Sequence, residues 1–247
     1  MTRIRSLLTI KKKTSGRDAQ GHISIRHRGG EQKRFLRTID WKRNKLDINA
    51  TVVSIEYDPG RTADIALLSY ADGEKSFILA PTGLKVGDVI VASLNAPIKD
   101  GNCLPLRNIP VGVPIHCLSF QKGKSAQLIK SAGSAAYVQS IDGNKATVKL
   151  PSGEIRIFNA DSCATIGLVG NADHSNLKVT KAVQWSLRGI RPSVRGVAQN
   201  PHSHPHGGGE GRSSIGMHPK TPWGKSAFRK TRKHKKASNR LIVKRRK

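Results

Sequence analysis

Acidic residues are scarce in this sequence. Only 16 of its 247 residues are Asp or Glu, against 44 Lys and Arg, so the formal net charge is +28. A monomer with such an excess of one sign repels itself, which makes an anionic partner the first expectation. Aromatic residues are also few, at 4%, so base stacking is undersupplied as a main binding mode. Contacts from Arg, Lys and backbone amides to phosphate fit the composition better.

Cysteines and long apolar runs are sparse as well. Cys103, Cys117 and Cys163 are odd in number, widely spaced and without a CxxC pair. They suggest neither a disulfide framework nor a cysteine zinc site, and they weakly indicate a reducing compartment. No run of about 18 apolar residues occurs, so no membrane span is expected. The N-terminus resembles a short transit peptide, but its apolar run Leu7–Ile10 is too short for a secretory signal.

The basic residues gather at the two ends of the chain. Residues 1–45 hold 14 basic and 3 acidic side chains, a net charge of +11, and residues 178–247 hold 19 and one, a net charge of +18. Residues 46–177 hold 11 basic and 12 acidic side chains, a net charge of −1. A near-neutral middle is thus flanked by two basic arms. We expect the arms to bind an anion, because segments that only aid solubility seldom need so much charge of one sign.

The middle of the chain is dense in short apolar segments separated by turn residues. Strands are expected at 50–57, 64–70, 75–79, 84–94, 115–120, 132–138, 146–150 and 154–158. The alternation of Ile23 and Ile25 with polar residues predicts a further half-buried strand, whereas Pro97–Pro114, with four prolines, is expected to be a connector or an extended crossing segment. The similar segments YADGEKSFILAP and KLPSGEIRIFNA suggest two barrels of like construction. The predicted fold is therefore all-β, with two small barrels and extended, basic, largely irregular N- and C-terminal arms.

After Lys178 the periodicity fades. Arg188, Arg191 and Arg195 alternate with Gly and Pro, and Trp223–Lys247 carries 12 basic residues and no acid. Alone, such a segment is expected to be disordered. On folded RNA it can thread between helices, because the phosphates supply the partners that a protein core does not.

The segment NPHSHPHGGGEG, residues 200–211, invites a metal or catalytic interpretation. His202, His204, His206 and His218 could supply imidazole ligands beside Glu210. Their spacing matches no zinc template, however, and flexible glycines offer no rigid surroundings for ligands. A general base needs a nucleophile or oxyanion site beside it, and the sequence supplies none. We expect instead that prolines hold this segment extended and that its bare glycines let a phosphate or ribose approach the backbone.

Other functional classes fit less well. The segment GGGEGRSS lacks the Gly-Lys-Ser/Thr of a nucleotide-binding P-loop. A DNA-binding protein needs a helix for the groove, and little amphipathic helix is expected. A polybasic membrane-surface protein needs such a helix too. Folded RNA, whose shape and backbone offer a surface to wrap, suits irregular basic arms joined to small barrels.

A series of motifs, in order from about Gly16 to the C-terminus, carries a family resemblance. The motifs are RHRGGEQKR (26–34), IEYDPGR (55–61), YADGEKSFILAP (70–81), LKVGD (84–88), LPLRNIPVG (104–112), LPSGE (150–154), RPSVRGVAQNP (191–201), HPHGGGEGR (204–212) and TPWG (221–224). Together they resemble the universal large-subunit ribosomal protein two family, bacterial type. The resemblance implies a basic N-terminal segment at 1–20, an OB-fold RNA-binding domain at 21–100, an SH3-like barrel domain at 101–180 and an extended basic arm at 181–247.

The same resemblance implies a function. It describes a structural, non-enzymatic constituent of the large ribosomal subunit. Such a protein is a primary ribosomal RNA binder near the peptidyl-transferase region that supports subunit assembly, subunit association and tRNA placement in translation. The implied partners are large-subunit ribosomal RNA, neighbouring ribosomal proteins and the small subunit, with no membrane. No cofactor or metal is expected apart from structural Mg²⁺ of the surrounding RNA.

The predicted RNA-binding residues combine the basic arms with the family motifs. They are Arg26, His27, Arg28, Lys33, Arg34, Lys42, Arg43, Arg188, Arg191, Arg195, Asn200, His204, His206, Gly207, Gly208, Gly209, Arg212, Lys225, Arg229, Arg232, Lys233, Lys235 and Lys236. By resemblance, His204 is the histidine next to the active region of the ribosome, where the catalytic centre is RNA.

Two departures from the family pattern stand out. Fifteen residues precede Gly16, where the family usually has a longer extension. Gln199, His202 and Ser203 replace residues of a VAMNPVDHPHGGGEG-like segment, which removes an acid before His204. These departures favour an organellar ribosome, in the mitochondrial matrix, over one in a bacterial cytoplasm.

Overall fold

The computed structural model describes residues 4–210, 212–228, 230–233 and 235–246. The chain divides into two compact units. The first unit comprises Met1–Lys11, Lys33–Lys178 and Ala237–Lys247, and the second comprises Lys12–Gln32 and Val179–Lys236. Each unit therefore combines segments that are distant in the sequence. Among the described residues, no helix is both long and apolar enough to cross a bilayer.

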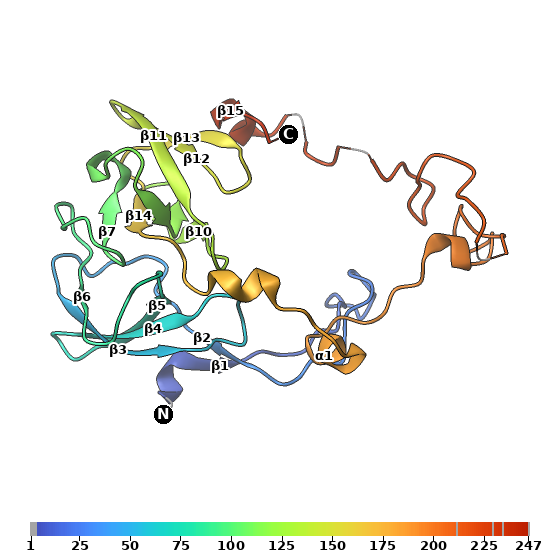
Figure 1. The fold of residues 1–247 in the computed structure, drawn as a ribbon, viewed down its shortest axis with the longest axis horizontal. Helices are drawn as coiled ribbons and strands as arrows, with labels where there is room; N and C mark the ends of the chain where they lie inside the picture. Colours follow the sequence, from blue (N-terminus) through green and yellow to red (C-terminus); the bar gives the residue numbers. More distant parts are fainter. Residues whose placement is uncertain (1–3, 211, 229, 234, 247) are drawn as a thin grey trace. The chain divides into compact units, whose positions relative to one another are not determined.

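A four-stranded antiparallel sheet forms the first half of the first unit (Figure 1). Its strands, in spatial order, are β5 (Lys75–Leu79), β4 (Ile65–Tyr70), β3 (Ala50–Glu56) and β6 (Val89–Ile90). A separate two-stranded sheet pairs β1 (Leu8–Ile10) with β2 (Phe35–Arg37). The turn between β4 and β5 contains Gly73 at φ 84°, a conformation that glycine adopts without steric cost.

The central strand β4 reads as one apolar run because both of its faces are covered. Ala66 and Leu68 pack in one hydrophobic cluster with Val52 of β3. Ile65 and Leu67 point the other way, into a cluster that also contains Val169 from the second half of the unit. Alternate residues of a strand face opposite sides of the sheet, so β4 contributes to two separate cores.

A seven-stranded sheet forms the second half of the first unit. Its strands, in spatial order, are β15 (Ile242–Lys244), β13 (Ile155–Asn159), β12 (Lys145–Lys149), β11 (Ala136–Asp142), β8 (Pro114–His116), β14 (Cys163–Ile166) and β7 (Cys103–Pro105). A short pair of strands, β9 (Leu118–Ser119) and β10 (Ala126–Leu128), accompanies it. Buried and exposed residues alternate along β12, as the sequence predicts for a strand with one face on a core.

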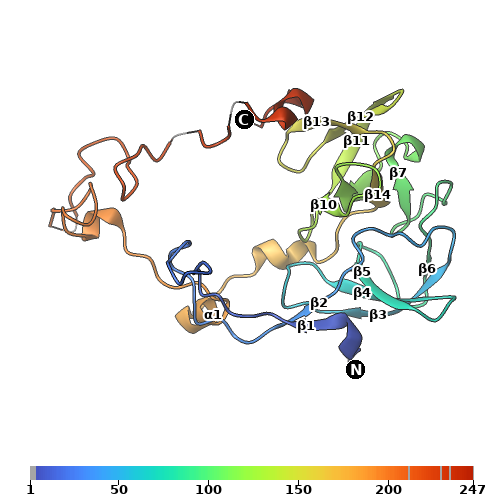
Figure 2. The ribbon, with the colours of Figure 1, turned by 180° about the vertical axis from the view of Figure 1, so that it is seen from behind.

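The two halves of the first unit are joined by backbone hydrogen bonds as well as by packing. The Thr82 amide donates to the carbonyl of Leu168 at 2.8 Å, and the Gly170 amide donates to the carbonyl of Ala80 at 2.9 Å. Both views of the ribbon show β14 and β7 on the side of the second sheet that lies nearest to β5 and β4 (Figure 2). The two halves are therefore in direct contact through main-chain hydrogen bonds and a shared hydrophobic cluster.

The second unit has little regular structure. The one α-helix in the described part of the chain, α1 (Ala182–Leu187), belongs to it. Short 3-10 helices are Arg5–Leu7, Leu106–Asn108, Ala172–Asn176, Gly196–Ala198 and Ala237–Leu241, of which only Gly196–Ala198 lies in the second unit. The irregular backbone expected after Lys178 is thus present, although it is organised by many turns and loop hydrogen bonds.

The all-β prediction is confirmed, and the curled sheets are consistent with two small barrels. Several strand predictions need correction. The expected strand around Ile23 and Ile25 is wrong: both side chains are exposed, and their segment is a loop in which the Ser24 and Ile25 amides donate to the carbonyl of Gly16. The expected strand 115–120 breaks at Cys117, whose φ is 48°. The segment 97–114, expected to be a connector or an extended crossing segment, contains the short strand β7, whose residues are buried.

Candidate nucleic-acid interface

A basic groove of about 840 Å³ runs beside the sheet of β1 and β2. The residues that line this groove, here called the β1–β2 groove, are Arg5, Leu8, Ile10, Lys33, Arg34, Phe35, Arg37, Tyr57 and Pro59. Four of them are cations, and none of these nine carries a carboxylate. The side chain of Tyr57 is 71% exposed and that of Phe35 37%, so ring faces stand among the charges. Cations bind phosphate and ring faces stack on bases, so the groove offers both contacts of a single-stranded nucleic acid.

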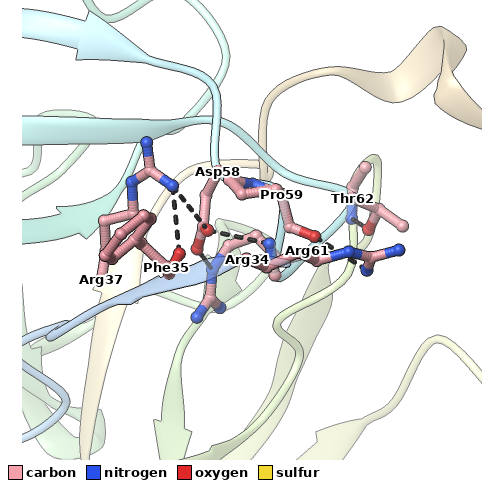
Figure 3. A network of polar contacts seen from close by, with 9 residues as sticks. Arg34, Phe35, Arg37, Asp58, Pro59, Arg61 and Thr62 are labelled. Carbon is pink, nitrogen blue, oxygen red and sulfur yellow. Dashed lines mark hydrogen bonds and ion pairs between the residues drawn. The ribbon is translucent and has the colours of Figure 1, made fainter. Parts of the chain in front are cut away.

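A buried acid contacts Arg37 of the groove and the nearby Arg61 (Figure 3). Asp58 is 1% exposed, and its carboxylate accepts hydrogen bonds from the Gly60 amide at 2.9 Å and from Nε of Arg61 at 2.7 Å. Nη1 of Arg37 lies 3.8 Å from the same carboxylate. Nη1 of Arg34 donates to the carbonyl of Pro59 at 3.2 Å. A guanidinium held in this way has a fixed position before any ligand arrives, which reduces the entropy lost on binding.

Lys42 and Arg43, both predicted to bind RNA, differ in the exposure of their side chains. The carboxylate of Asp40 accepts hydrogen bonds from both backbone amides, at 3.0 and 2.8 Å. Arg43 has a φ of 54°, which turns its side chain into the protein. It is 7% exposed, and its Nη2 donates to the carbonyl of Gly101 at 3.4 Å. Lys42 is exposed. Lys42 is therefore placed to meet a phosphate, whereas Arg43 belongs to the interior of the first unit.

In the second unit, residues 26–32 hydrogen-bond to residues 187–191. The Gly29 amide donates to the carbonyl of Gly189 at 3.1 Å, and the Arg191 amide donates to the carbonyl of His27 at 3.0 Å. Gly189 permits this approach, because a Cβ there would lie 2.9 Å from the Cβ of Glu31. The exposed predicted cations that the pairing brings into one platform are Arg26, Arg28, Arg188 and Arg191.

Two exposed tryptophans lie against cations of this platform. The guanidinium carbon of Arg26 lies 5.3 Å from the centre of the Trp223 ring, and that of Arg188 lies 5.6 Å from the ring of Trp185. Trp223 is 73% exposed at the tip of a turn closed by a hydrogen bond from the Gly224 amide to the carbonyl of Thr221. Stacked Arg and Trp present a flat, positively charged surface suited to bases and phosphates together.

The segment 200–210 folds on itself instead of extending. The His204 amide donates to the carbonyl of Asn200 at 3.1 Å, the Gly207 amide to that of His204 at 2.9 Å, and the Gly208 amide to that of Gln199 at 3.2 Å. His204 is 7% exposed. The expectation of an extended segment is therefore wrong, because local turns with backbone hydrogen bonds fold it back on itself.

The histidine rings of this segment accept hydrogen bonds from the backbone. Nδ1 of His204 accepts from the amide of His206 at 3.0 Å, and Nε2 of His206 accepts from the amide of Lys220 at 2.9 Å. Burial lowers the pKa of His204, and the neighbouring His206 and Arg26 lower it further. A neutral ring with Nδ1 as acceptor carries its proton on Nε2. In the described residues no group of three His, Cys, Asp or Glu side chains is placed to hold a metal ion.

Gly196, which precedes the segment, and Gly207 within it are required by the protein's own packing. A Cβ on Gly196 would lie 2.5 Å from Cε1 of His204, and one on Gly207 would lie 2.5 Å from the carbonyl oxygens of Gln199 and Asn200. Such distances are far below van der Waals contact, so a side chain would displace the loop. The sequence interpretation assigned Gly207 to close approach by RNA, and the structure supplies a different reason for it.

The remaining predicted site residues lie on the surface of the chain. Exposed predicted residues outside the features above are Arg195, Asn200, Gly208, Gly209, Arg212, Lys225, Arg232, Lys233, Lys235 and Lys236. Arg229 lies outside the described residues. The sequence interpretation did not single out Arg5, Arg37, Tyr57 or Trp223. The cation–aromatic spacing Lys33–Phe35–Arg37 and the Thr-Pro-Trp-Gly turn are the sequence signals that could have identified them.

Two family models match the chain, and together they span both units. Residues 4–92 match the model described as Ribosomal Proteins L2, RNA binding N-terminal domain. Residues 99–224 match the model described as Ribosomal Proteins L2, C-terminal domain. The first match contains every residue that lines the β1–β2 groove, and the second contains the folded segment 200–210. The chain therefore belongs to the ribosomal protein L2 family and is an RNA-binding protein of the ribosome.

Proposed function

We propose that this protein is a primary binder of large-subunit ribosomal RNA near the peptidyl-transferase region. Its role there is structural: it supports subunit assembly, subunit association and tRNA placement. The observation that carries the proposal is the β1–β2 groove, where four cations and two exposed rings gather without a carboxylate among the lining residues. The groove lies in the part of the chain that matches an RNA-binding domain.

The two units divide the binding. The β1–β2 groove takes a strand whose bases are splayed out, because Phe35 and Tyr57 offer stacking faces between the cations. The platform of Arg26, Arg28, Arg188 and Arg191 takes phosphates of folded RNA, to which the exposed cations of residues 212–236 add. The boundaries 1–20, 21–100, 101–180 and 181–247 are proposed for the corresponding domains.

Catalysis in this proposal belongs to the RNA. Nδ1 of His204 already accepts a hydrogen bond from the backbone, and the ring is buried. A general base needs a free lone pair within reach of the proton that it removes, so the arrangement supports a positioning role for His204. No cofactor is assigned to the chain; Mg²⁺ is assigned to the surrounding RNA. The further partners proposed are neighbouring ribosomal proteins and the small subunit, in an organellar ribosome.

Salt-dependent binding of the full chain to large-subunit RNA tests the proposal. When Z phosphates are contacted, log K falls with log salt with a slope of roughly −0.7Z to −0.9Z. Removing one phosphate-binding cation with Arg37→Ala should reduce that slope by about 1. Lys145→Ala, on a strand that does not line the groove, is the matched control and should leave the slope unchanged. A slope near zero for the unaltered chain would overturn the proposal.

A further inference from the structure

The three cysteines of the chain, distant in sequence, converge at one place in the first unit. Cys103 lies on β7, Cys117 follows β8, and Cys163 begins β14. All three line a small cavity of about 20 Å³ together with Arg43 and His116. Both β7 and β8 are hydrogen-bonded to β14. The sheet therefore brings the thiols together, although the sequence spacing gave no sign of it.

Cys103 and Cys163 lie on directly paired strands. In the antiparallel register Cys103 is opposite Thr165, and Cys163 is opposite Pro105. Residues two apart on a strand share a face, so the two cysteines are diagonal neighbours on the same face. Both side chains line the same small cavity. Neither cysteine forms a disulfide in this structure.

We propose that Cys163 and Cys103 form a reversible disulfide when the protein meets a peroxide, with Cys163 attacking and Cys103 resolving. The Cys163 thiolate attacks one peroxide oxygen, the O–O bond breaks, and the Cys163 sulfenic acid forms with release of water or an alcohol. The Cys103 sulfur then attacks the sulfenic sulfur, the S–O bond breaks, and the hydroxyl leaves as water with the proton of the Cys103 thiol. Two thiols are oxidised, and one peroxide is reduced.

The surroundings of the three thiols differ in a way that favours attack by Cys163 before attack by Cys103. Cys163 is half-buried and also lines a groove of about 570 Å³ with Lys42, Lys122 and Asp161, so a small oxidant can reach it. The neighbouring Cys103 thiol lowers the pKa of Cys163 to about 7; Lys122 adds to this effect, while burial and Asp161 oppose it. Burial raises the pKa of Cys117 to about 12. The neighbouring Cys163 and burial raise the pKa of Cys103 as well. A thiol attacks a peroxide as its thiolate, so Cys163 attacks first, and Cys103 acts only on the sulfenic acid formed beside it. Cys117 has no such sulfenic acid to attack on the adjacent strand and is the control.

The geometry of the pair indicates a labile bond. Diagonal neighbours in an antiparallel pair have Cα atoms about 7–8 Å apart, whereas disulfides join Cα atoms up to about 6.8 Å apart. Closure therefore requires the strand ends to approach by roughly 1 Å. The backbone of Cys163 is held by Ser119, whose Oγ accepts from its amide at 3.1 Å and donates to its carbonyl at 3.3 Å. A bond that works against such restraints is readily reduced again.

Peptide mapping by mass spectrometry of the full chain after hydrogen peroxide treatment tests the proposal. The expected product is one linked peptide pair, Cys103 with Cys163, lighter by two hydrogen masses and restored by dithiothreitol. Cys103→Ser should instead give a sulfenic acid at Cys163, trapped by dimedone. Cys117→Ser should react as the unaltered chain does, and Cys163→Ser should leave Cys103 reduced.

Three outcomes would overturn the proposal. They are the absence of a Cys103–Cys163 link at full oxidation of Cys163, dimedone labelling of Cys117 at the rate of Cys163, and unchanged oxidation of Cys103 in Cys163→Ser. A thermal melt of each reduced variant checks that it is folded before oxidation. Because the readout is a covalent mass, it does not depend on RNA binding.

Discussion

The backbone amide of His206 donates a hydrogen bond to Nδ1 of His204, 3.0 Å away. This contact fixes the tautomer of the His204 ring and makes the ring part of the loop that surrounds it. Asn200, through its carbonyl, holds the amide of the same histidine. His204 thus stabilises the 200–210 segment through both its ring and its backbone amide.

The first prediction concerns that hydrogen-bond acceptor. His204→Asn places an amide oxygen near the position of Nδ1, whereas His204→Ala removes the acceptor and leaves a buried amide unsatisfied, at a cost of about 1–3 kcal/mol. We expect the alanine variant to lose amide protection at His206 in hydrogen exchange, and the asparagine variant to keep most of it. Subunits assembled with His204→Asn should form peptide bonds at close to the normal rate. A large loss of that rate in an assembled subunit with an intact loop would contradict the structural role.

The second prediction concerns Gly196. In Gly196→Ala the new methyl would lie 2.5 Å from Cε1 of His204, so the ring must move, with a destabilisation of about 1–3 kcal/mol. We expect faster proteolysis within 196–210 in the free protein, before any RNA is added. Ala198→Ser, in the same 3-10 helix and exposed, is the control. Normal protease resistance of Gly196→Ala would show that the loop tolerates the displacement.

The third prediction is a pH dependence of the first unit. His116 is 1% exposed, and its Nδ1 lies 2.8 Å from the carbonyl of Gly167, so this nitrogen carries the proton. Burial lowers the pKa of His116 from 6.5 to about 4, and Arg43 adds to the shift. A depressed pKa gives stability that is present above the unfolded value and is lost as pH falls through the folded value. We expect roughly 3 kcal/mol of unfolding free energy to disappear between about pH 6.5 and pH 4.

Urea unfolding at a series of pH values measures this dependence. The same series on His116→Asn, which keeps a donor for Gly167 but cannot be protonated in this range, should show a flatter profile between those two pH values. Equal slopes for both proteins would mean that other groups cause the pH dependence.

The fourth prediction separates orientation from charge in the β1–β2 groove. Asp58→Asn keeps an oxygen for the Gly60 amide but removes the charge that holds Arg37 and Arg61. We expect unfolding free energy to fall by about 2–3 kcal/mol and RNA affinity to fall, with the salt slope unchanged because no cation is lost. Arg37→Ala should reduce the slope itself. A lower slope for Asp58→Asn would mean that the acid does more than orient its partners.

The sequence predicted the strands whose apolar pattern is local. β3, β5, β12 and β13 lie within a residue or two of their expected positions, because each has a face on a core and a turn at its end. β7 was hidden by the prolines around it, and its burial depends on β14, far along the chain. The alternation of Ile23 and Ile25 misled, since both side chains are exposed in a loop.

The candidate site was predictable by charge and only partly by geometry. Arg26 and Arg28 were identified from the basic arm, and both are exposed. Nothing local distinguished Arg43 from Lys42; the positive φ and the distant Gly101 carbonyl decide which of them is buried. Likewise, the glycines near His204 indicated that some group approaches the backbone closely. The fold of the loop decides that these groups are the His204 ring and backbone carbonyls.

The pairing of β15 with β13 gives the second unit a closed topology. Residues 179–236 leave the first unit after Lys178 and re-enter it at Ala237, with Ile242 opposite Arg156 and Lys244 opposite Ile155. The basic segment is therefore a loop anchored at both ends, and its conformational freedom is smaller than that of a tail of equal length. β15 is synthesised after this segment, so the segment has only its N-terminal anchor while it is being made. The pairing of β15 with β13 is therefore the step that converts the basic segment from a free tail into a closed loop.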